Sequence, residues 1–119
     1  QELRDAIEKY ASLGVEVQIT ELDVSVYEKE HSRRDPLPKD EDDAFKPEQE
    51  QKQIEQYEML FRVFRDFGDT LTGVTFWNIS DRYSWLDNFP VRGRKNYPLL
   101  FDGKLQPKKA YYKVIDFEK

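Results

Sequence analysis

Two short apolar segments, each followed by a long polar connection, limit the folds open to this chain. In residues 15–22, valine and isoleucine alternate with polar residues, which is the period of a strand with one buried face. Residues 71–79, "LTGVTFWNI", are rich in β-branched and aromatic side chains and predict a second buried strand. The polar connections cover about residues 25–46 and 80–106. Connections of this length are uncommon inside a compact domain and are often functional.

Apolar residues at helical spacing predict three helices around these strands, and proline or glycine marks their ends. The predicted helices are residues 2–13, which Gly14 ends, residues 47–67, which begin at Pro47 and stop before Gly68, and residues 107–117, which begin at Pro107. Proline is favoured at the first position of a helix, because the N–H that it lacks would have no partner there. The order of elements is therefore helix, strand, helix, strand, helix.

Strands that alternate with helices predict a parallel sheet, and such a sheet needs helices on both faces. Two strands are too few for this arrangement, so we expect the chain to be part of a larger α/β fold. Both long connections follow a strand, whereas each connection from a helix to the next strand is short. This asymmetry is typical of a (β/α)8 barrel, in which the connections after the strands build the active site. Residue 1 is Gln and lies at the start of a predicted helix, so we expect the sequence to begin inside a longer protein.

The composition argues against several classes of function. The 119 residues carry a formal net charge of −5, which disfavours binding to nucleic acid or to an anionic membrane surface. The absence of cysteine excludes disulfides and thiolate metal sites, and no apolar run approaches the roughly 20 residues of a membrane span. His31 is interpreted as solvent-exposed rather than metal-binding, and the acidic run at 40–43 lacks the pattern of a calcium loop. Arg92, Arg94 and Lys95 are interpreted as solvated loop charges.

Two acidic residues interrupt the end of the first strand. Glu21 and Asp23 differ by two positions, so we expect their side chains to point to the same side of the strand. In a barrel, the carboxyl end of a strand faces the active site. One interpretation is that Glu21 is a nucleophile or base and that Asp23 holds its hydrogen-bond network. The other is that the two carboxylates only cap the strand end.

Two tryptophans and further acids follow the second strand. Trp77 lies near the strand end, and "SDRYSWLD" then brings Asp81, Trp85 and Asp87. An indole can cover the apolar face of a sugar ring while carboxylates bind its hydroxyls, so Trp77, Trp85 and Asp81 are predicted to contact a carbohydrate. The alternative is that the tryptophans are core residues. That alternative is stronger for Trp77, in a buried strand, than for Trp85, in a polar connection.

Taken together, "VQITELDV", "TFWNISDRYSWL" and "PLLFD" give the chain a resemblance to glycoside hydrolase family 10, the endo-1,4-β-xylanases. The resemblance covers essentially all of residues 1–119 and matches them to the C-terminal part of the catalytic barrel, an incomplete domain with the last two strands and three helices. It implies retaining hydrolysis of internal β-1,4 bonds in xylan, with no cofactor and with xylan or xylo-oligosaccharide as the partner. It also favours a secreted or periplasmic location over an intracellular one.

The resemblance implies roles for individual residues. Glu21 would be the catalytic nucleophile, and Asp23 would belong to the network that orients it. Trp77 and Trp85 would wall the subsites on the glycone side of the cleavage point. Asn78 stands where the family often has glycine, so these subsites are expected to differ in detail from the family pattern.

Several parts of the family pattern are absent from the sequence. Leu86 stands where an arginine often follows the tryptophan, and the histidine of the preceding strand is missing. A retaining glycosidase also needs a second carboxyl, roughly 5–5.5 Å from the nucleophile, as acid and base. The family's acid/base block on the fourth strand does not occur in this chain, so the fragment alone is expected to be inactive. Its open strand edges are expected to favour self-association.

Two other functions stay open. A non-catalytic carbohydrate-binding segment would use Trp77 and Trp85 and would ignore Glu21. A related retaining β-1,4-glucanase would share the chemistry but not the substrate. Replacing Glu21 by glutamine separates the first alternative from an enzyme, because turnover would be lost while binding is retained. A comparison of substrates decides the second.

Overall fold

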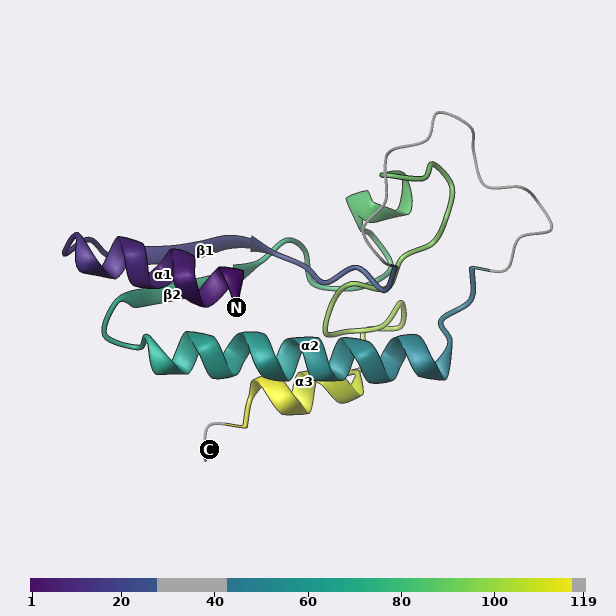
Figure 1. Ribbon diagram of the computed structural model, residues 1–119. Helices are drawn as coiled ribbons and strands as arrows, with labels where there is room; N and C mark the ends of the chain where they lie inside the picture. The colour runs from purple at the N-terminus through teal and green to yellow at the C-terminus, as the bar shows by residue number, and fades with distance from the viewer. Residues whose placement is uncertain (28–42, 117–119) are drawn as a thin grey trace.

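The computed structural model describes residues 1–27 and 43–116. These residues form α1 (Glu2–Ser12), β1 (Val17–Leu22), α2 (Pro47–Asp66), β2 (Leu71–Phe76), the short 3-10 helix η1 (Trp85–Asp87) and α3 (Lys109–Val114) (Figure 1). The order of the helices and strands agrees with the prediction from sequence. His31 and residues 40–42 lie outside the described residues, so the predictions made for them stay predictions.

The ends of α1 and α2 follow from the residues placed there. Gly14 has φ +74°, a left-handed conformation that glycine adopts without a steric cost, and this conformation turns the chain out of α1. Pro47 is the first residue of α2, as expected. The side-chain oxygen of Gln49 accepts a hydrogen bond from the backbone N–H of Lys46 at 3.0 Å and so satisfies a donor at this helix start.

The predicted bounds of both strands are too wide. β1 begins at Val17, which lies opposite Leu71, whereas Val15 precedes the paired region and is half exposed. β2 ends at Phe76 rather than at residue 79. Asn78 has φ 108°, which is incompatible with a continued strand, so the chain leaves the sheet before that residue.

The last helix is also shorter than predicted, because its proline belongs to a different element. Pro107 forms an isolated antiparallel bridge with Phe101. The chain is therefore still extended at Pro107, and α3 begins only at Lys109. It ends at Val114 instead of residue 117.

β1 and β2 pair in parallel, and an irregularity lies near the carboxyl end of β1. Ile19 lies opposite Val74 and Leu22 opposite Phe76, so three steps along β1 match two steps along β2. One extra residue in β1 forms a bulge. Ile19 and Leu22 both pack against the core, whereas Glu21, between them, is exposed.

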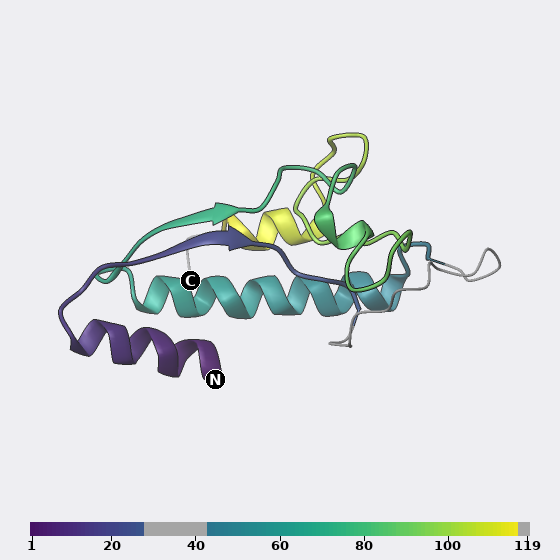
Figure 2. The same ribbon diagram turned by 90° about the horizontal axis from the view of Figure 1, so that it is seen from above.

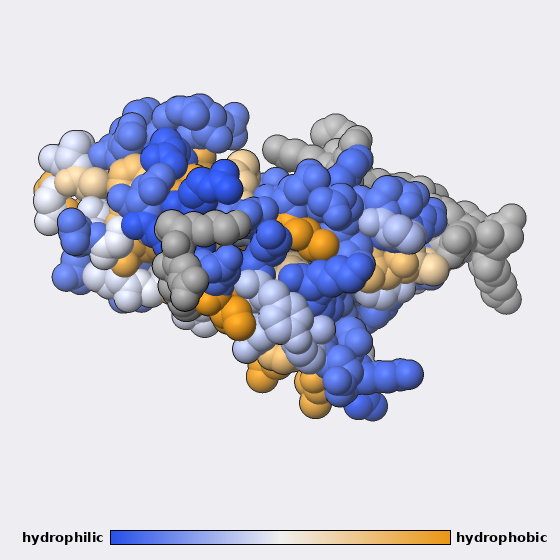
Figure 3. All heavy atoms as spheres, turned by 90° about the horizontal axis from the view of Figure 1, so that it is seen from below, coloured by the Kyte–Doolittle hydropathy of each residue, from blue (hydrophilic) through white to orange (hydrophobic). Residues whose placement is uncertain are grey.

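The helices α2 and α3 build the core on one side of this sheet. Tyr57, Phe61 and Phe64 of α2 are buried, and the Phe61 ring lies 6.1 Å from that of Phe76 in β2. Val114 of α3 is buried in the same cluster. Seen from above, none of the described helices covers the opposite side of the two strands (Figure 2). The face on which α2 and α3 lie is mostly hydrophilic, with small apolar patches (Figure 3).

The two strands place their carboxyl ends at the same end of the molecule. Both arrows in Figure 1 point toward the segment between β2 and α3, which carries η1. This segment contains no long helix or strand, and it is held to the strand ends by side-chain hydrogen bonds. Among the described residues, no helix combines the length and the apolar character that a membrane crossing requires.

Candidate active site

The carboxyl ends of the two strands bring Glu21 and Trp77 onto neighbouring strands. Glu21 is the second-last residue of β1, and Trp77 directly follows β2. The backbone N–H of Trp77 donates to the carbonyl oxygen of Leu22 at 2.9 Å, so the sheet pairing continues one residue past Phe76. Because Glu21 lies at the bulge and is exposed, its carboxylate is accessible to a ligand at this end of the sheet.

Asp23 links the end of β1 to η1. Its Oδ2 accepts a hydrogen bond from the indole Nε1–H of Trp85 at 2.9 Å, across 62 positions of sequence. The negative charge of Glu21 contributes to a raised pKa of Asp23. Asp23 therefore has a specific partner in the tryptophan segment, which a simple strand cap does not require.

The pKa of Asp23 is raised above its ordinary value, chiefly because the side chain is partly buried. The hydrogen bond from Trp85 lowers this pKa, and the neighbouring charge of Glu21 raises it further. A carboxyl whose pKa is higher in the folded state favours folding most while it is protonated in both states. That contribution is lost as the pH rises through the pKa of Asp23 in the folded protein.

Trp77 and Trp85 lie together around a hollow. The hollow has a volume of about 350 Å³ and is lined by Trp77, Asn78 and Trp85. The exposed fractions of the two tryptophans are 48% and 49%, so neither is a core residue in the described part of the chain. Phe89 stacks against Trp85 with ring centroids 5.2 Å apart and an angle of 20° between the planes. This stack and the bond to Asp23 fix the indole from two directions.

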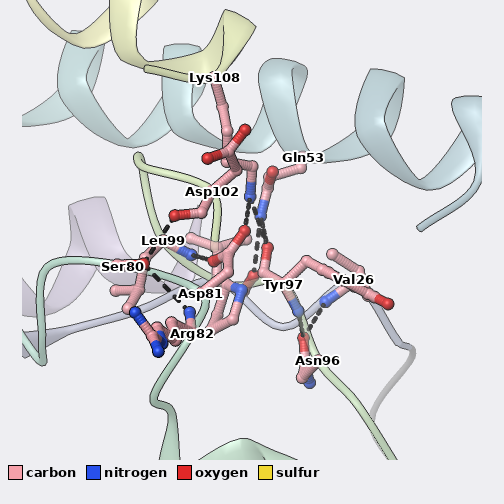
Figure 4. Close-up of polar contacts among 12 residues, drawn as sticks. Val26, Gln53, Ser80, Asp81, Arg82, Asn96, Tyr97, Leu99, Asp102 and Lys108 are labelled. Atoms are coloured by element: carbon pink, nitrogen blue, oxygen red, sulfur yellow. Dashed lines mark hydrogen bonds and ion pairs between the residues drawn. The ribbon is translucent and has the colours of Figure 1, made fainter. Parts of the chain in front are cut away.

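Asp81 does not line this hollow and lies in a buried network. Its exposed fraction is 3%, its Oδ1 accepts from the backbone N–H of Leu99 at 2.8 Å, and its Oδ2 pairs with Nζ of Lys108 at 2.8 Å. Figure 4 shows these bonds, with Lys108 also donating to the carbonyl oxygen of Tyr97. Burial raises the pKa of Asp81 and lowers that of Lys108, and each charge offsets part of the other's shift. Both oxygens of Asp81 are engaged, so its geometry supports a structural role rather than the predicted contact with substrate.

Two of the three cations interpreted as solvated loop charges are held by specific partners. Arg94 is buried, and its guanidinium lies 3.7 Å from the centre of the Tyr27 ring. Lys95 pairs with Asp87 of η1 at 2.9 Å. Only Arg92 is exposed as expected. The interpretation was therefore wrong for Arg94, which joins the connection after β2 to Tyr27, and for Lys95, which binds to Asp87 within that connection.

The arrangement suits a reaction at a sugar. A carboxylate at an accessible position can attack a carbon, and two half-exposed indoles beside it offer flat apolar faces for sugar rings. In residues 1–27 and 43–116, no three histidine or acidic side chains gather closely enough to hold a metal ion.

Comparison with known proteins decides the family. The model of glycosyl hydrolase family 10 matches residues 1–117. The chain belongs to this family.

Relatives within family 10 are similar along nearly the whole chain. Endo-1,4-beta-xylanase A of Caldicellulosiruptor saccharolyticus is 50% identical over 117 residues, which are 97% of this chain and 32% of the relative. Endo-1,4-beta-xylanase B of Paenibacillus barcinonensis is 49% identical over 116 residues, or 96% of this chain and 32% of the relative. A solved structure of a mutant in complex with xylotriose is 54% identical with a TM-score of 0.83, and the match covers 97% of this chain and 33% of that one.

The family 10 match confirms the predicted fold. The relatives are (β/α)8 barrels, and the chain spans about a third of their length. Its two parallel strands and three helices are therefore a segment of such a barrel. The bare side of the sheet in Figure 2 is the side that faces the inside of a barrel.

The bond between Trp85 and Asp23 gives a testable titration. In the family 10 barrel that contains this chain, Trp85→Phe keeps an aromatic ring but removes the indole donor. Because this donor lowers the pKa of Asp23, we expect the Asp23 titration to move to higher pH. The measurement is the carboxyl ¹³C chemical shift of labelled aspartate, with Asp23→Asn for assignment. Trp77→Phe is the matched control and should leave the titration unchanged; an unchanged or lower pKa in Trp85→Phe would contradict the role of this bond.

Proposed function

We propose that this chain supplies the nucleophile and part of the sugar-binding wall of a retaining endo-1,4-β-xylanase. The observation that carries the proposal is the position of Glu21: exposed, at the end of β1, beside Asp23 and the tryptophan hollow. The names of the similar family 10 proteins support xylan as the substrate.

In the proposed reaction, the Glu21 carboxylate attacks the anomeric carbon of a xylose unit. The bond from that carbon to the glycosidic oxygen breaks, and a second carboxyl protonates the leaving oxygen. The covalent xylosyl-Glu21 ester is then hydrolysed by water, with the second carboxyl acting as base. Two inversions at the same carbon give net retention.

Asp23, Trp77 and Trp85 have supporting roles in this proposal. Asp23 holds the Trp85 indole by a 2.9 Å hydrogen bond and lies within electrostatic range of Glu21. Trp77 and Trp85 present their half-exposed rings to the hollow, where the sugars on the glycone side would stack. Only Trp77, Asn78 and Trp85 line the 350 Å³ hollow among the described residues, so the rest of the barrel is needed to complete a cleft.

We treat residues 1–119 as an incomplete catalytic domain. The second carboxyl is contributed by the remaining two thirds of the barrel, so the 119 residues alone are expected not to hydrolyse xylan. In the described residues β1 and β2 each pair on one side only, which leaves two open edges. Pairing of these edges between copies would produce oligomers of the isolated chain.

The test uses the complete barrel and a 2-fluoro-xylobioside with a good leaving group. The fluorine slows hydrolysis of the ester intermediate, so the nucleophile stays labelled and can be found by digestion and mass spectrometry. We expect the label on Glu21. A label on another residue, or an unlabelled folded protein, would remove Glu21 from the mechanism and favour a segment that only binds carbohydrate. Turnover of β-1,4-glucan in preference to xylan would instead point to a glucanase.

A further inference from the structure

Asn96 is a fully buried amide whose side-chain bonds connect it to the segment after β1. Its exposed fraction is 0%. Its Nδ2 donates to Oγ of Ser25 at 2.8 Å, and its Oδ1 accepts from the backbone N–H groups of Val26 at 3.1 Å and Tyr97 at 2.8 Å. Figure 4 shows the bond between Asn96 and Val26. A buried amide that is bonded at both its oxygen and its nitrogen fixes the backbone around it.

The backbone of Asn96 connects it to η1, the short helix that carries Trp85. Its N–H donates to Oδ1 of Asp87 at 2.8 Å, and Oδ2 of the same carboxylate pairs with Nζ of Lys95 at 2.9 Å. Asp87 is the last residue of η1, and Trp85 is the first. Asn96 thus joins the short helix that carries Trp85 to Ser25 and Val26.

These bonds close a ring. We call the connected residues 23–26, 85–87 and 96 the Asn96 ring. On one side of it, Trp85 donates to Asp23 at 2.9 Å through a bond that lies at the surface. On the opposite side, partly buried bonds of Asn96 join Asp87 to Ser25. Other contacts also hold the connection after β2 against residues 23–27, such as the bond from the Tyr27 hydroxyl to the carbonyl oxygen of Lys95 at 2.9 Å. The bonds of Asn96 differ from that contact because they reach η1 directly, through Asp87.

We propose that Asn96 is a positioning residue for carbohydrate binding, which holds Trp85 in place against Asp23 through the Asn96 ring. This inference rests on the proposed function, because the sugar is what Trp85 is proposed to contact. Asn96 is fully buried and is not among the residues that line the tryptophan hollow, so it acts through Trp85 and Asp23 and does not touch the sugar.

The backbone that carries Glu21 is held by contacts outside this ring. Glu21 lies within β1, which pairs with β2 through Leu22 and Phe76. The hydrogen bond from the N–H of Trp77 to the carbonyl oxygen of Leu22 holds the same end of β1. Loss of the ring should therefore weaken substrate binding more than it slows the chemical step.

The test compares Asn96→Ala with Asn88→Ala in the complete barrel. Asn88 lies at the surface next to η1, and in the described residues only its backbone makes a hydrogen bond. For xylotetraose, we expect Asn96→Ala to raise KM about 10-fold and to change kcat by less than about 3-fold, because a displaced Trp85 would bind the substrate and the transition state less well by the same amount. Asn88→Ala should change neither. A fall in kcat at unchanged KM would overturn the proposal.

Asn96→Asp separates positioning from stability. The aspartate keeps the acceptor for Val26 and Tyr97, and the Ser25 hydroxyl can donate to it, but it places a charge in the interior beside Asp87. We expect its Tm to fall, while its KM stays within about 3-fold of the original. If KM rises in both Asn96 variants in step with the fall in Tm, the role of Asn96 is only structural and the proposal is wrong.

Hydrogen exchange of the Trp85 indole tests the ring without turnover. We expect the Nε1–H of Trp85, assigned with Trp85→Phe, to exchange at least about 10-fold faster in Asn96→Ala than in Asn88→Ala, because its bond to Asp23 opens more often. Equal exchange would contradict the ring whatever the activity. If the original barrel does not hydrolyse xylan but exchange rises as expected, the proposed function fails while the ring stands.

Discussion

Replacing Glu21 by alanine in the complete barrel is expected to lower kcat for xylan by about 10⁴-fold or more. Glu21 would form the covalent bond to the sugar, and removal of a nucleophile leaves only the binding and proton-transfer parts of the catalysis. Its accessible position at the bulge of β1 makes this prediction specific. The measurement is the initial rate of release of reducing sugar, with binding of xylotetraose followed by calorimetry.

Azide gives the variant a second readout. The small anion can occupy the space of the missing carboxylate and attack the anomeric carbon from the same side, which displaces the leaving sugar and yields an α-xylosyl azide. Partial recovery of turnover with this product is the expected result. Glu16→Ala, which removes an exposed glutamate just before the same strand, is the control and should keep full activity. A loss of less than about 10-fold in Glu21→Ala would mean that the nucleophile is another group.

The largest expected loss of stability follows the replacement of Lys108 by methionine. The side chains of Lys108 and Asp81 are 5% and 4% exposed and pair at 2.8 Å. Removal of one partner leaves a buried charge without compensation, for which the usual cost is about 3–5 kcal/mol in the free energy of unfolding. The measurement is chemical denaturation of the complete barrel, followed by circular dichroism.

Two comparisons make this prediction specific to the pair. Lys109→Met changes an exposed neighbour whose Nζ is 3.8 Å from Glu50, and it should cost less than about 0.5 kcal/mol. Asp81→Asn combined with Lys108→Met removes both charges and should recover at least about half of the loss. The deficit of Lys108→Met should also shrink at acidic pH, because burial already raises the pKa of Asp81 and a protonated Asp81 carries no charge. A double variant that is no more stable than Lys108→Met would contradict this account.

The elements that could be predicted from sequence are those with a regular period or a distinctive end. The alternation before Glu21, the apolar stripe of α2 and the residues Gly14 and Pro47 each have a local physical cause, and they predicted the helices and strands to within a few residues. Because the strands were predicted from local patterns, Glu21 and Trp77 could be placed at the carboxyl ends of neighbouring parallel strands. Parallel pairing then brought them together.

The connection from β2 to α3 could not be predicted in the same way, because its order comes from contacts distant in sequence. Asp81 was predicted to contact a sugar because it lies in a polar segment. Its buried partner Lys108 lies 27 positions later and could not be inferred from the local sequence. The residues next to Asn96 do not indicate that its side chain is buried, and its bond to Ser25 spans 71 positions. A polar residue in an irregular segment carries no period that reveals whether it faces water or a buried partner.

The Asn96 ring also has a consequence for recombination among family 10 barrels during evolution. All of its members lie between residues 23 and 96, and the strand that carries Glu21 begins only a few positions earlier. A recombination event with its breakpoint before Val17 would transfer the tryptophan, the acid that holds it and the amide behind them as one inherited unit. A breakpoint between Tyr27 and Trp85 would combine two halves from different ancestors. Hybrids of that second kind would be viable only where both parents kept compatible residues at positions 23, 25, 85, 87 and 96.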